Sequence, residues 1–152
     1  MAKLKIITGK DNPILRAVSE PVKNFDSALK KFAKEMKVAM EKAKGLGIAA
    51  PQVGKNWRVF WVTLGYKDEQ EVCVAMVNPE IVWSSEEMEI DEEGCLSLPG
   101  DYGKVERPRA VKGEFFDLDG GRQVFELEGL DARVVQHEKD HLDGVLFIDK
   151  LV

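Results

Sequence analysis

The chain has 152 residues, of which 44% are hydrophobic and 32% are charged, a balance typical of a folded globular protein. This length predicts one domain over residues 1–152. The net charge of −5 argues against a protein that grips nucleic-acid phosphates, and no apolar run of about 18 residues is present to span a membrane. Within the first eight residues, the apolar stretch is too short for a secretory signal. The two cysteines are too few to form a disulfide framework. We therefore expect a soluble, cytoplasmic protein.

The first predicted elements are helices. The Asn-Pro pair at residues 12–13 is typical of the start of a short helix. Over residues 26–44 apolar side chains recur every three or four positions, which predicts an amphipathic helix that packs on the core. Asp26 or Ser27 can cap its start, and we expect Gly45 to end it in the left-handed conformation.

The middle of the chain is rich in β-branched and aromatic residues and predicts strands. The expected strands cover residues 58–63, 71–77, 80–83, 105–106, 110–118 and 123–127. Asp119-Gly-Gly-Arg122 predicts a hairpin turn between the last two strands. We expect the acidic run at residues 86–93 to form a solvated edge. A helical period returns over residues 131–142, so the predicted fold is α+β, with antiparallel β-sheets packed around a C-terminal helix.

Both histidines of the chain lie in one motif, His137-Glu-Lys-Asp-His141. Positions i and i+4 share one face of a helix, so the two imidazoles can bind one ion at about 2.0–2.1 Å. Glu138 follows the first histidine directly and is placed to take a proton from a metal-bound water. The motif therefore predicts a metal-binding helix with an adjacent general base.

We expect the third ligand upstream of this motif, because only eleven residues follow His141. Cys95 is the natural candidate, since a thiolate suits a divalent transition metal and the neighbouring Gly94 permits close backbone approach. Alternatively, Cys73 and Cys95 could complete a closed structural zinc site with the two histidines. Against this, Cys73 lies in an alternating apolar strand, and a closed site leaves Glu138 without a task.

A third feature is the glycine-rich stretch Gly45-Leu-Gly-Ile-Ala-Ala-Pro-Gln-Val-Gly54. It lacks the Lys-Ser/Thr ending and the preceding strand of a phosphate-binding loop. Its small residues permit close backbone approach, so an extended peptide could pair with it; a packed turn is the alternative. Gln52 is its one polar side chain.

Three motifs resemble the signature motifs of peptide deformylases and occur in the same order: Gly45-Leu-Gly-Ile-Ala-Ala-Pro-Gln52, Glu93-Gly-Cys-Leu-Ser97 and Gln136-His-Glu-Lys-Asp-His-Leu142. The resemblance spans nearly the whole chain, including residues 12–16 and 105–107. It implies a metal-dependent hydrolase that removes the N-formyl group from nascent chains beginning with formyl-methionine and releases formate.

The same resemblance implies the roles of individual residues. The implied metal ligands are Cys95, His137 and His141. The ion would be Fe(II) in the cell, with zinc or nickel as substitutes. A metal-bound water would attack the formyl carbon while Glu138 acts as general base and then protonates the leaving amine. The Gln52 amide and the Leu96 backbone N–H would hold the developing oxyanion.

Substrate contacts also follow from the resemblance. The backbone positions implied to pair with the peptide are Leu46, Gly47 and Gly94. The methionine pocket would be lined partly by Leu46, Leu130 and Val134. Arg107 and Asp140 match a pair that steadies the metal helix. The implied partners are N-formylmethionyl peptides, nascent chains and the ribosome, with no direct nucleic-acid specificity and no membrane.

Three features depart from the family pattern. The chain ends five residues after Phe147, where many relatives continue into a helix that helps docking on the ribosome. Arg133 and Asp91 stand where relatives often place apolar pocket residues. We expect the stem of Arg133 to pack while its charge reaches water, which predicts a more polar pocket mouth. A peptidase with the same chemistry and a binding module on structural zinc are the competing functions.

Overall fold

The structure is a computed structural model that describes residues 3–152; Met1 and Ala2, the start of the segment inspected for a targeting signal, lie outside it. Its helical segments, with η for 3-10 helices, are α1 (Pro13–Arg16), α2 (Ser27–Lys42), η1 (Ala50–Val53), α3 (Gly129–Leu142) and η2 (Phe147–Lys150). Its strands are β1 (Gly47–Ala49), β2 (Val59–Leu64), β3 (Val72–Ser84), β4 (Met88–Cys95), β5 (Leu98–Pro108), β6 (Ala110–Phe116) and β7 (Arg122–Glu128).

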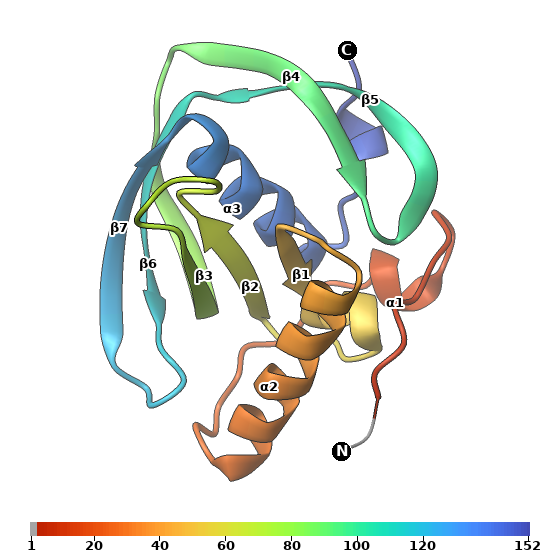
Figure 1. Cartoon of the computed structure of the whole chain (residues 1–152), viewed down its shortest axis with the longest axis vertical. Coiled ribbons are helices and arrows are strands. Elements are labelled where there is room, and N and C mark those ends of the chain that lie inside the picture. Colours follow the sequence, from red (N-terminus) through yellow and green to blue (C-terminus); the bar gives the residue numbers. More distant parts are fainter. Residues whose placement is uncertain (1–2) are drawn as a thin grey trace.

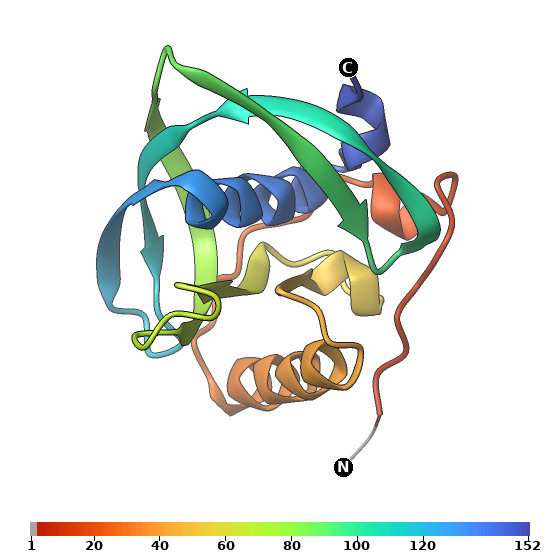
Figure 2. The ribbon, with the colours of Figure 1, turned by 45° about the horizontal axis from the view of Figure 1, so that its top comes forward.

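Helix α3 lies between two antiparallel sheets. One sheet has the strand order β1-β2-β3-β6-β7, and the second consists of the β4–β5 hairpin. Figure 1 and Figure 2 show α3 crossing the molecule with the hairpin on one side and β1 and β2 on the other, while α2 lies beyond these strands. The predicted α+β fold is confirmed. No helix in the described range has both the length and the apolar character needed to cross a bilayer.

Helix α2 forms for the reasons read from its sequence. Its apolar stripe is buried in one cluster with residues of β1 and β2, including Met36, Met40, Ile48 and Val59. The side chain of Asp26 caps the start by accepting the Leu29 N–H at 3.0 Å. The expected end is wrong: Lys44, not Gly45, adopts positive φ, at 58°. Gly45 is needed for close packing instead, because a Cβ there would lie 2.7 Å from Leu96 Cδ1.

Strand β3 replaces the two separate strands predicted over 71–83. Its pairing with β6 shifts register between Val77 and Glu80. The intervening Asn78 has φ of 49°, and its side chain accepts the Val22 N–H at 2.8 Å and donates to the Val22 carbonyl at 2.9 Å. Asparagine tolerates the left-handed region, so the strand bends here without ending.

From Met88 onward the acidic run belongs to β4, and the expectation of a solvated edge is wrong for its last member, Glu93. Most of its carboxylates are exposed, but the Glu93 residue is only 7% exposed. Pairing with β5 runs from Met88 opposite Pro108 to Gly94 opposite Tyr102, so β5 is far longer than the predicted strand at 105–106. The hairpin thereby carries Glu93 and Cys95 toward α3.

Candidate active site

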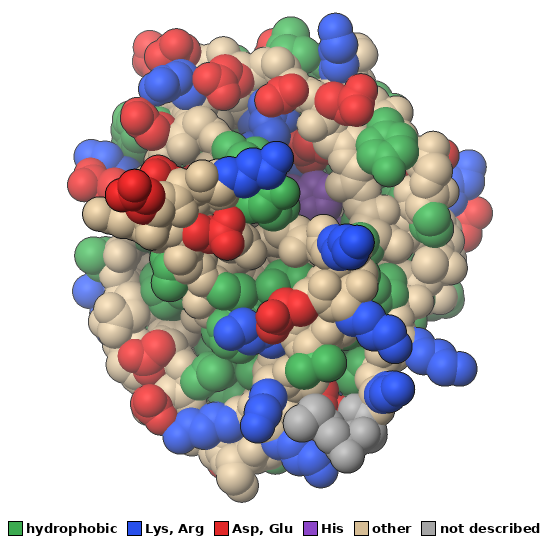
Figure 3. Space-filling view, in the orientation of Figure 1, with side chains coloured by type: hydrophobic (Ala, Val, Ile, Leu, Met, Phe, Trp, Pro, Cys, Tyr) green, Lys and Arg blue, Asp and Glu red, His purple; other side chains and the backbone are tan. Residues whose placement is uncertain are grey.

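A cleft of about 490 Å³ opens between α3, the segment before β1 and the end of the β4–β5 hairpin. This size is typical of sites for small ligands. Figure 3 shows a histidine at the bottom of a hollow on this face of the molecule. The cleft contains the histidine motif, the glycine-rich stretch and the cysteine motif, which lie far apart in the sequence.

Three potential metal ligands meet in this cleft. His137 and His141 lie one turn apart on α3, and Cys95 is the last residue of β4. The ligand atoms of the three all lie within 4.8 Å of one another, and Cys95 Sγ is 3.3 Å from His141 Nε2. One thiolate and two imidazoles form a donor set that suits divalent transition metals, so the residues present fit such an ion.

The surroundings of the two histidines shift their pKa values in opposite directions. Burial lowers the pKa of His141 well below its usual value, which keeps its imidazole neutral and able to coordinate. Burial would also lower the pKa of His137, but hydrogen bonds to Cys95 and Glu93 raise it to about 10. His137 Nδ1 lies 2.8 Å from Glu93 Oε1, so its N–H can donate there and leave Nε2 for an ion.

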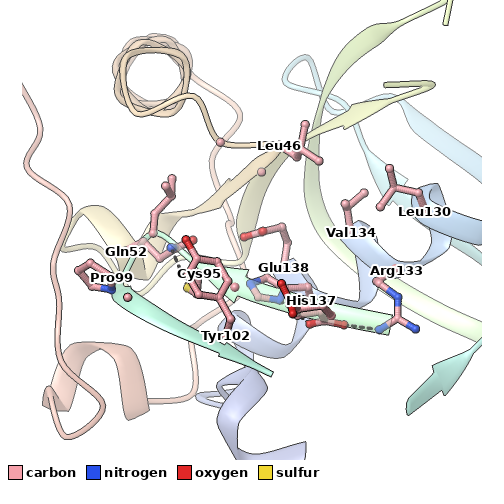
Figure 4. A pocket seen from close by; sticks show the side chains of 17 residues that line it. Leu46, Gln52, Cys95, Pro99, Tyr102, Leu130, Arg133, Val134, His137 and Glu138 are labelled. Carbon is pink, nitrogen blue, oxygen red and sulfur yellow. Dashed lines mark hydrogen bonds and ion pairs between the residues drawn. The ribbon is translucent and has the colours of Figure 1, made fainter. Parts of the chain in front are cut away.

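Glu138 is buried beside the ligands and points into the cleft (Figure 4). Its Oε1 has no hydrogen-bond partner in residues 3–152. Burial raises the pKa of Glu138 to about 7, the range in which a carboxyl group exchanges protons efficiently at neutral pH. Gly47 permits this placement, because a Cβ at that position would lie 2.7 Å from Glu138 Oε2.

Gln52 approaches the cluster from the opposite wall. Its Oε1 accepts the Ala49 N–H at 2.9 Å, which fixes the amide plane. Its Nε2 then lies 3.6 Å from Cys95 Sγ and 3.2 Å from Ser97 Oγ. Leu96 lines the cleft directly after Cys95. Gln52 and Leu96, the two residues expected to supply oxyanion donors, therefore both line the cleft with Cys95.

The expected peptide contacts also line the cleft. Among residues 3–152, strand β1 pairs with β2 alone, so its other edge is free of strand partners there. Leu46, Gly47 and Gly94 lie along the opening. Figure 4 shows Leu46, Leu130 and Val134 at one end of the cleft, with Gln52 and Pro99 at the other. An unpaired edge facing a cleft allows an extended peptide to add as a strand.

Behind His137, Glu93 is the centre of a buried ion cluster. Arg107 donates through Nε to Glu93 Oε2 at 2.6 Å and through Nη2 to Oε1 at 2.9 Å. Its Nη1 donates to Asp140 Oδ2 at 2.9 Å. Burial alone would raise the pKa of Glu93, but the hydrogen bonds from Arg107 and His137 hold it far below its usual range. Glu93 is therefore a fixed anion behind His137.

Two expectations about the pocket mouth are wrong. The Arg133 residue is only 6% exposed, and its Nη1 donates to Glu93 Oε2 at 2.6 Å and to the Val105 carbonyl at 3.0 Å. Its charge is directed inward because a buried carboxylate and strand carbonyls, rather than water, accept its protons. Asp91 is exposed and does not line the cleft.

Several cleft residues escaped the sequence reasoning. Glu93 was grouped with the acidic run, although it directly precedes the Gly-Cys pair, which was the available signal. Tyr102 lines the cleft because it pairs with Gly94, where a Cβ would lie 2.6 Å from its ring. Nothing in the local sequence indicates that pairing.

Cys73 does not join the three ligands. It lies on β3 opposite Thr63 and packs against the apolar cluster under α2. Burial raises the pKa of its thiol, which favours the uncharged form. The closed site with two cysteines and two histidines is therefore not formed.

Comparisons with known proteins agree with this geometry. Residues 4–152 match the family model described as polypeptide deformylase. The peptide deformylase of Brucella suis is 49% identical over 140 residues, which cover 92% of this chain and 80% of that protein. The crystal structure of peptide deformylase from Thermotoga maritima is similar with a TM-score of 0.92 and 41% identity, covering 100% of this chain and 99% of the other. A Met-Ala-Ser-bound peptide deformylase from Acinetobacter baumannii has a TM-score of 0.91 and 39% identity, covering 99% of both chains.

Proposed function

The chain belongs to the polypeptide deformylase family, and we propose that Cys95, His137 and His141 hold the ion with which it works. The enzyme hydrolyses the formyl amide at the N-terminal methionine of new polypeptides and releases formate. The observation that carries the proposed site is the convergence of three ligand atoms within 4.8 Å beside a buried carboxyl group.

The ion we propose is Fe(II) in the cell, with zinc or nickel able to replace it. The donor set supports any of these ions, since thiolate and imidazole suit several transition metals. When bound, such an ion supplies Lewis acidity and lowers the pKa of coordinated water toward about 7.

Glu138 is the proposed general base and acid. Its buried carboxyl group, whose pKa is near 7, takes a proton from water and returns it to the departing amine. Gln52 Nε2–H and the Leu96 backbone N–H are the proposed donors to the developing oxyanion. The hydrogen bond from the Ala49 N–H holds the Gln52 amide in place, so this donor needs little reorganisation.

The substrate is proposed to lie as an added strand along the free edge of β1. Backbone groups of Leu46, Gly47 and Gly94 would pair with it, and this bonding accepts many sequences because it ignores side chains. The first side chain, methionine, would enter between Leu46, Leu130 and Val134. The Met-Ala-Ser bound to the Acinetobacter baumannii relative supports a peptide that begins with methionine as the ligand.

The remaining proposals concern the whole chain. We propose that residues 1–152 act as one catalytic domain in the cytoplasm, where N-formylmethionyl nascent chains are made. Contact with the ribosome is part of this proposal, with no membrane partner. Arg107 and Asp140 are proposed to steady α3 and its ligands through their 2.9 Å ion pair.

Metal content and turnover of two cysteine variants test the site. We expect Cys95→Ala to lose both stoichiometric metal and formate release from formyl-Met-Ala-Ser. Cys73→Ala is the matched control and should retain both, because Cys73 packs under α2 away from the cleft. Full metal content in Cys95→Ala, or metal loss in Cys73→Ala, would overturn the ligand assignment.

A further inference from the structure

The charges of this chain are divided unevenly along it. Residues 1–58 contain 13 Lys and Arg against 5 Asp and Glu, a net charge of +8. Residues 59–152 contain 9 against 22, a net charge of −13. The overall value of −5 therefore conceals a strongly basic part, and such asymmetry is typical of proteins that contact polyanions.

Helix α2 concentrates this positive charge on its outer face. Lys31, Lys34 and Lys42 are exposed and recur at helical spacing on one ridge, opposite the buried stripe. The ridge is about 16 Å long at 1.5 Å per residue. None of the three lysines forms an ion pair in the described part of the chain, whereas Lys30 is held by Asp119 at 2.6 Å. We call these three residues the lysine ridge.

Further cations extend the lysine ridge. Lys44 is exposed directly after α2. Lys55 Nζ lies 4.0 Å from the centre of the Trp57 ring, and Lys37 Nζ lies 5.3 Å from that of Trp61. Lys44, Lys55 and Lys37 therefore add to the positive charge around α2.

The positively charged region around α2 and the opening of the cleft lie on the same face of the molecule. In Figure 3, Lys and Arg side chains gather over the lower part of this face, where α2 lies in Figure 1. Asp and Glu gather toward the top, and the histidine of the cleft lies between the two regions. A polyanion that contacts the lower part would therefore leave the cleft open beside it.

We propose that the lysine ridge docks on the phosphate backbone of RNA, so that the cleft faces the ribosome that makes the substrate. This inference rests on the proposed function, because formylated nascent chains emerge from an RNA-rich particle. Unpaired ammonium groups fit backbone phosphates without reading bases. The acidic remainder is repelled by RNA, which orients the enzyme with α2 inward.

Binding to a labelled RNA duplex and to purified bacterial ribosomes tests the proposal. The test variant is Lys31→Glu/Lys34→Glu/Lys42→Glu, and glutamate preserves helix propensity. Its control, Lys67→Glu/Lys104→Glu/Lys112→Glu, makes the same change in net charge at exposed positions outside α2.

We expect the ridge variant to bind RNA and ribosomes at least about tenfold more weakly at low salt. The slope of log K against log[salt] should flatten by about 2.7, because each neutralised phosphate contributes about −0.9. The control should stay within about twofold of the native protein. Equal binding by the native protein and the ridge variant would overturn the proposal. An equal loss in the control, or binding to anionic lipid vesicles but not to RNA, would also overturn it.

Turnover of free formyl-Met-Ala-Ser separates this inference from the proposed function. The ridge variant should keep the native kcat/KM on this tripeptide, because none of its three positions lines the cleft. A native protein that fails to release formate would refute the proposed function. The RNA-binding measurement would still test the proposed role of the lysine ridge.

Discussion

Glu93 joins four side-chain interactions in a buried region of the molecule. It accepts two hydrogen bonds from Arg107, one from Arg133 and one from His137. Arg133 also donates to the carbonyls of Val105 on β5 and Glu89 on β4. A single arginine thereby links α3 to both strands of the hairpin that carries Cys95.

Replacing Arg133 with Met should destabilise the fold while keeping the aliphatic stem. We expect the free energy of unfolding to fall by about 1.5–3 kcal/mol, the range for a lost hydrogen bond to a charged group. Arg107 still forms an ion pair with Glu93 in this variant. The loss of stability therefore stays below that caused by a buried charge with no partner. Urea unfolding measures the change. Arg122→Met, which breaks an exposed pair with Glu114, is the control and should cost no more than about 1 kcal/mol; equal costs would contradict the role of burial.

A substitution at Gln52 can remove the hydrogen-bond donor of its side-chain amide while keeping the acceptor. Gln52→Glu keeps an oxygen for the Ala49 N–H but removes the N–H donor that lies toward Cys95. We expect kcat/KM for formyl-Met-Ala-Ser to fall about 10²–10³-fold, the usual effect of losing one oxyanion donor. Metal content should remain stoichiometric. A variant with native turnover would refute the oxyanion role of Gln52.

Residues within short motifs could be predicted from the sequence, and their partners could not. His137, Glu138 and His141 are tied by helical spacing, and Cys95 follows from its chemistry. The side chains that orient them, Glu93 and Arg133, come from elements 40 residues apart. Their pairing is set by the hairpin crossing α3, a tertiary contact that leaves no local pattern.

The end of α3 is fixed by a glycine that packs against α1. Gly144 has φ of 73°, and a Cβ there would lie 2.3 Å from the Arg16 carbonyl oxygen. Arg16 in turn pairs with Asp149 of η2 at 3.2 Å through Nη2. The first and last helical segments thus meet where α3 ends.

Gly144→Ala should be costly for two separate reasons. A left-handed residue with a Cβ costs about 1–2 kcal/mol, and the collision with backbone adds about 1–3 kcal/mol. Gly129→Ala is the matched control, since Gly129 has φ of 64° and no atom within 4 Å of the added Cβ. Thermal and urea unfolding should show a loss of about 2–5 kcal/mol for Gly144→Ala and about 1–2 kcal/mol for Gly129→Ala. Equal losses of stability in the two variants would contradict the predicted collision between the added Cβ and the backbone of Arg16.

Among the secondary-structure elements, the spacing of apolar residues in the sequence predicted the helices more accurately than the strands. The apolar stripe of α2 and the turn at Gly120 between β6 and β7 were predicted, because both depend on local chemistry. The continuity of β3 was missed, since Asn78-Pro79 signals a break that tertiary hydrogen bonds to Val22 override. The length of β5 was missed because most of its side chains are exposed.

At the scale of the whole molecule, the proposed metal ligands come from two parts of the fold. Cys95 lies at the turn of the β4–β5 hairpin, while His137 and His141 belong to the helix packed on the large sheet. An ion held by all three therefore joins the hairpin to the rest of the fold. Binding that occurs only in the native state adds to the free energy of unfolding.

Removing the ion should consequently lower thermal stability. At a free metal concentration of about 100 Kd, binding contributes about 2.7 kcal/mol, which a strong chelator abolishes. Scanning calorimetry with and without chelator should show a lower Tm for the stripped protein, restored by added zinc. In Cys95→Ala the chelator should have almost no effect. A native protein whose Tm changes with neither chelator nor zinc would contradict a metal site shared by the β4–β5 hairpin and α3.

The most direct measurement is formate release from formyl-Met-Ala-Ser by Fe(II)-loaded protein prepared without oxygen, compared with Glu138→Gln at equal iron content. We predict turnover by the native protein and a loss of about 10²–10⁴-fold in the variant, the usual contribution of a general acid–base group. Native turnover in Glu138→Gln, or an iron-loaded native protein that releases no formate, would contradict the site described here.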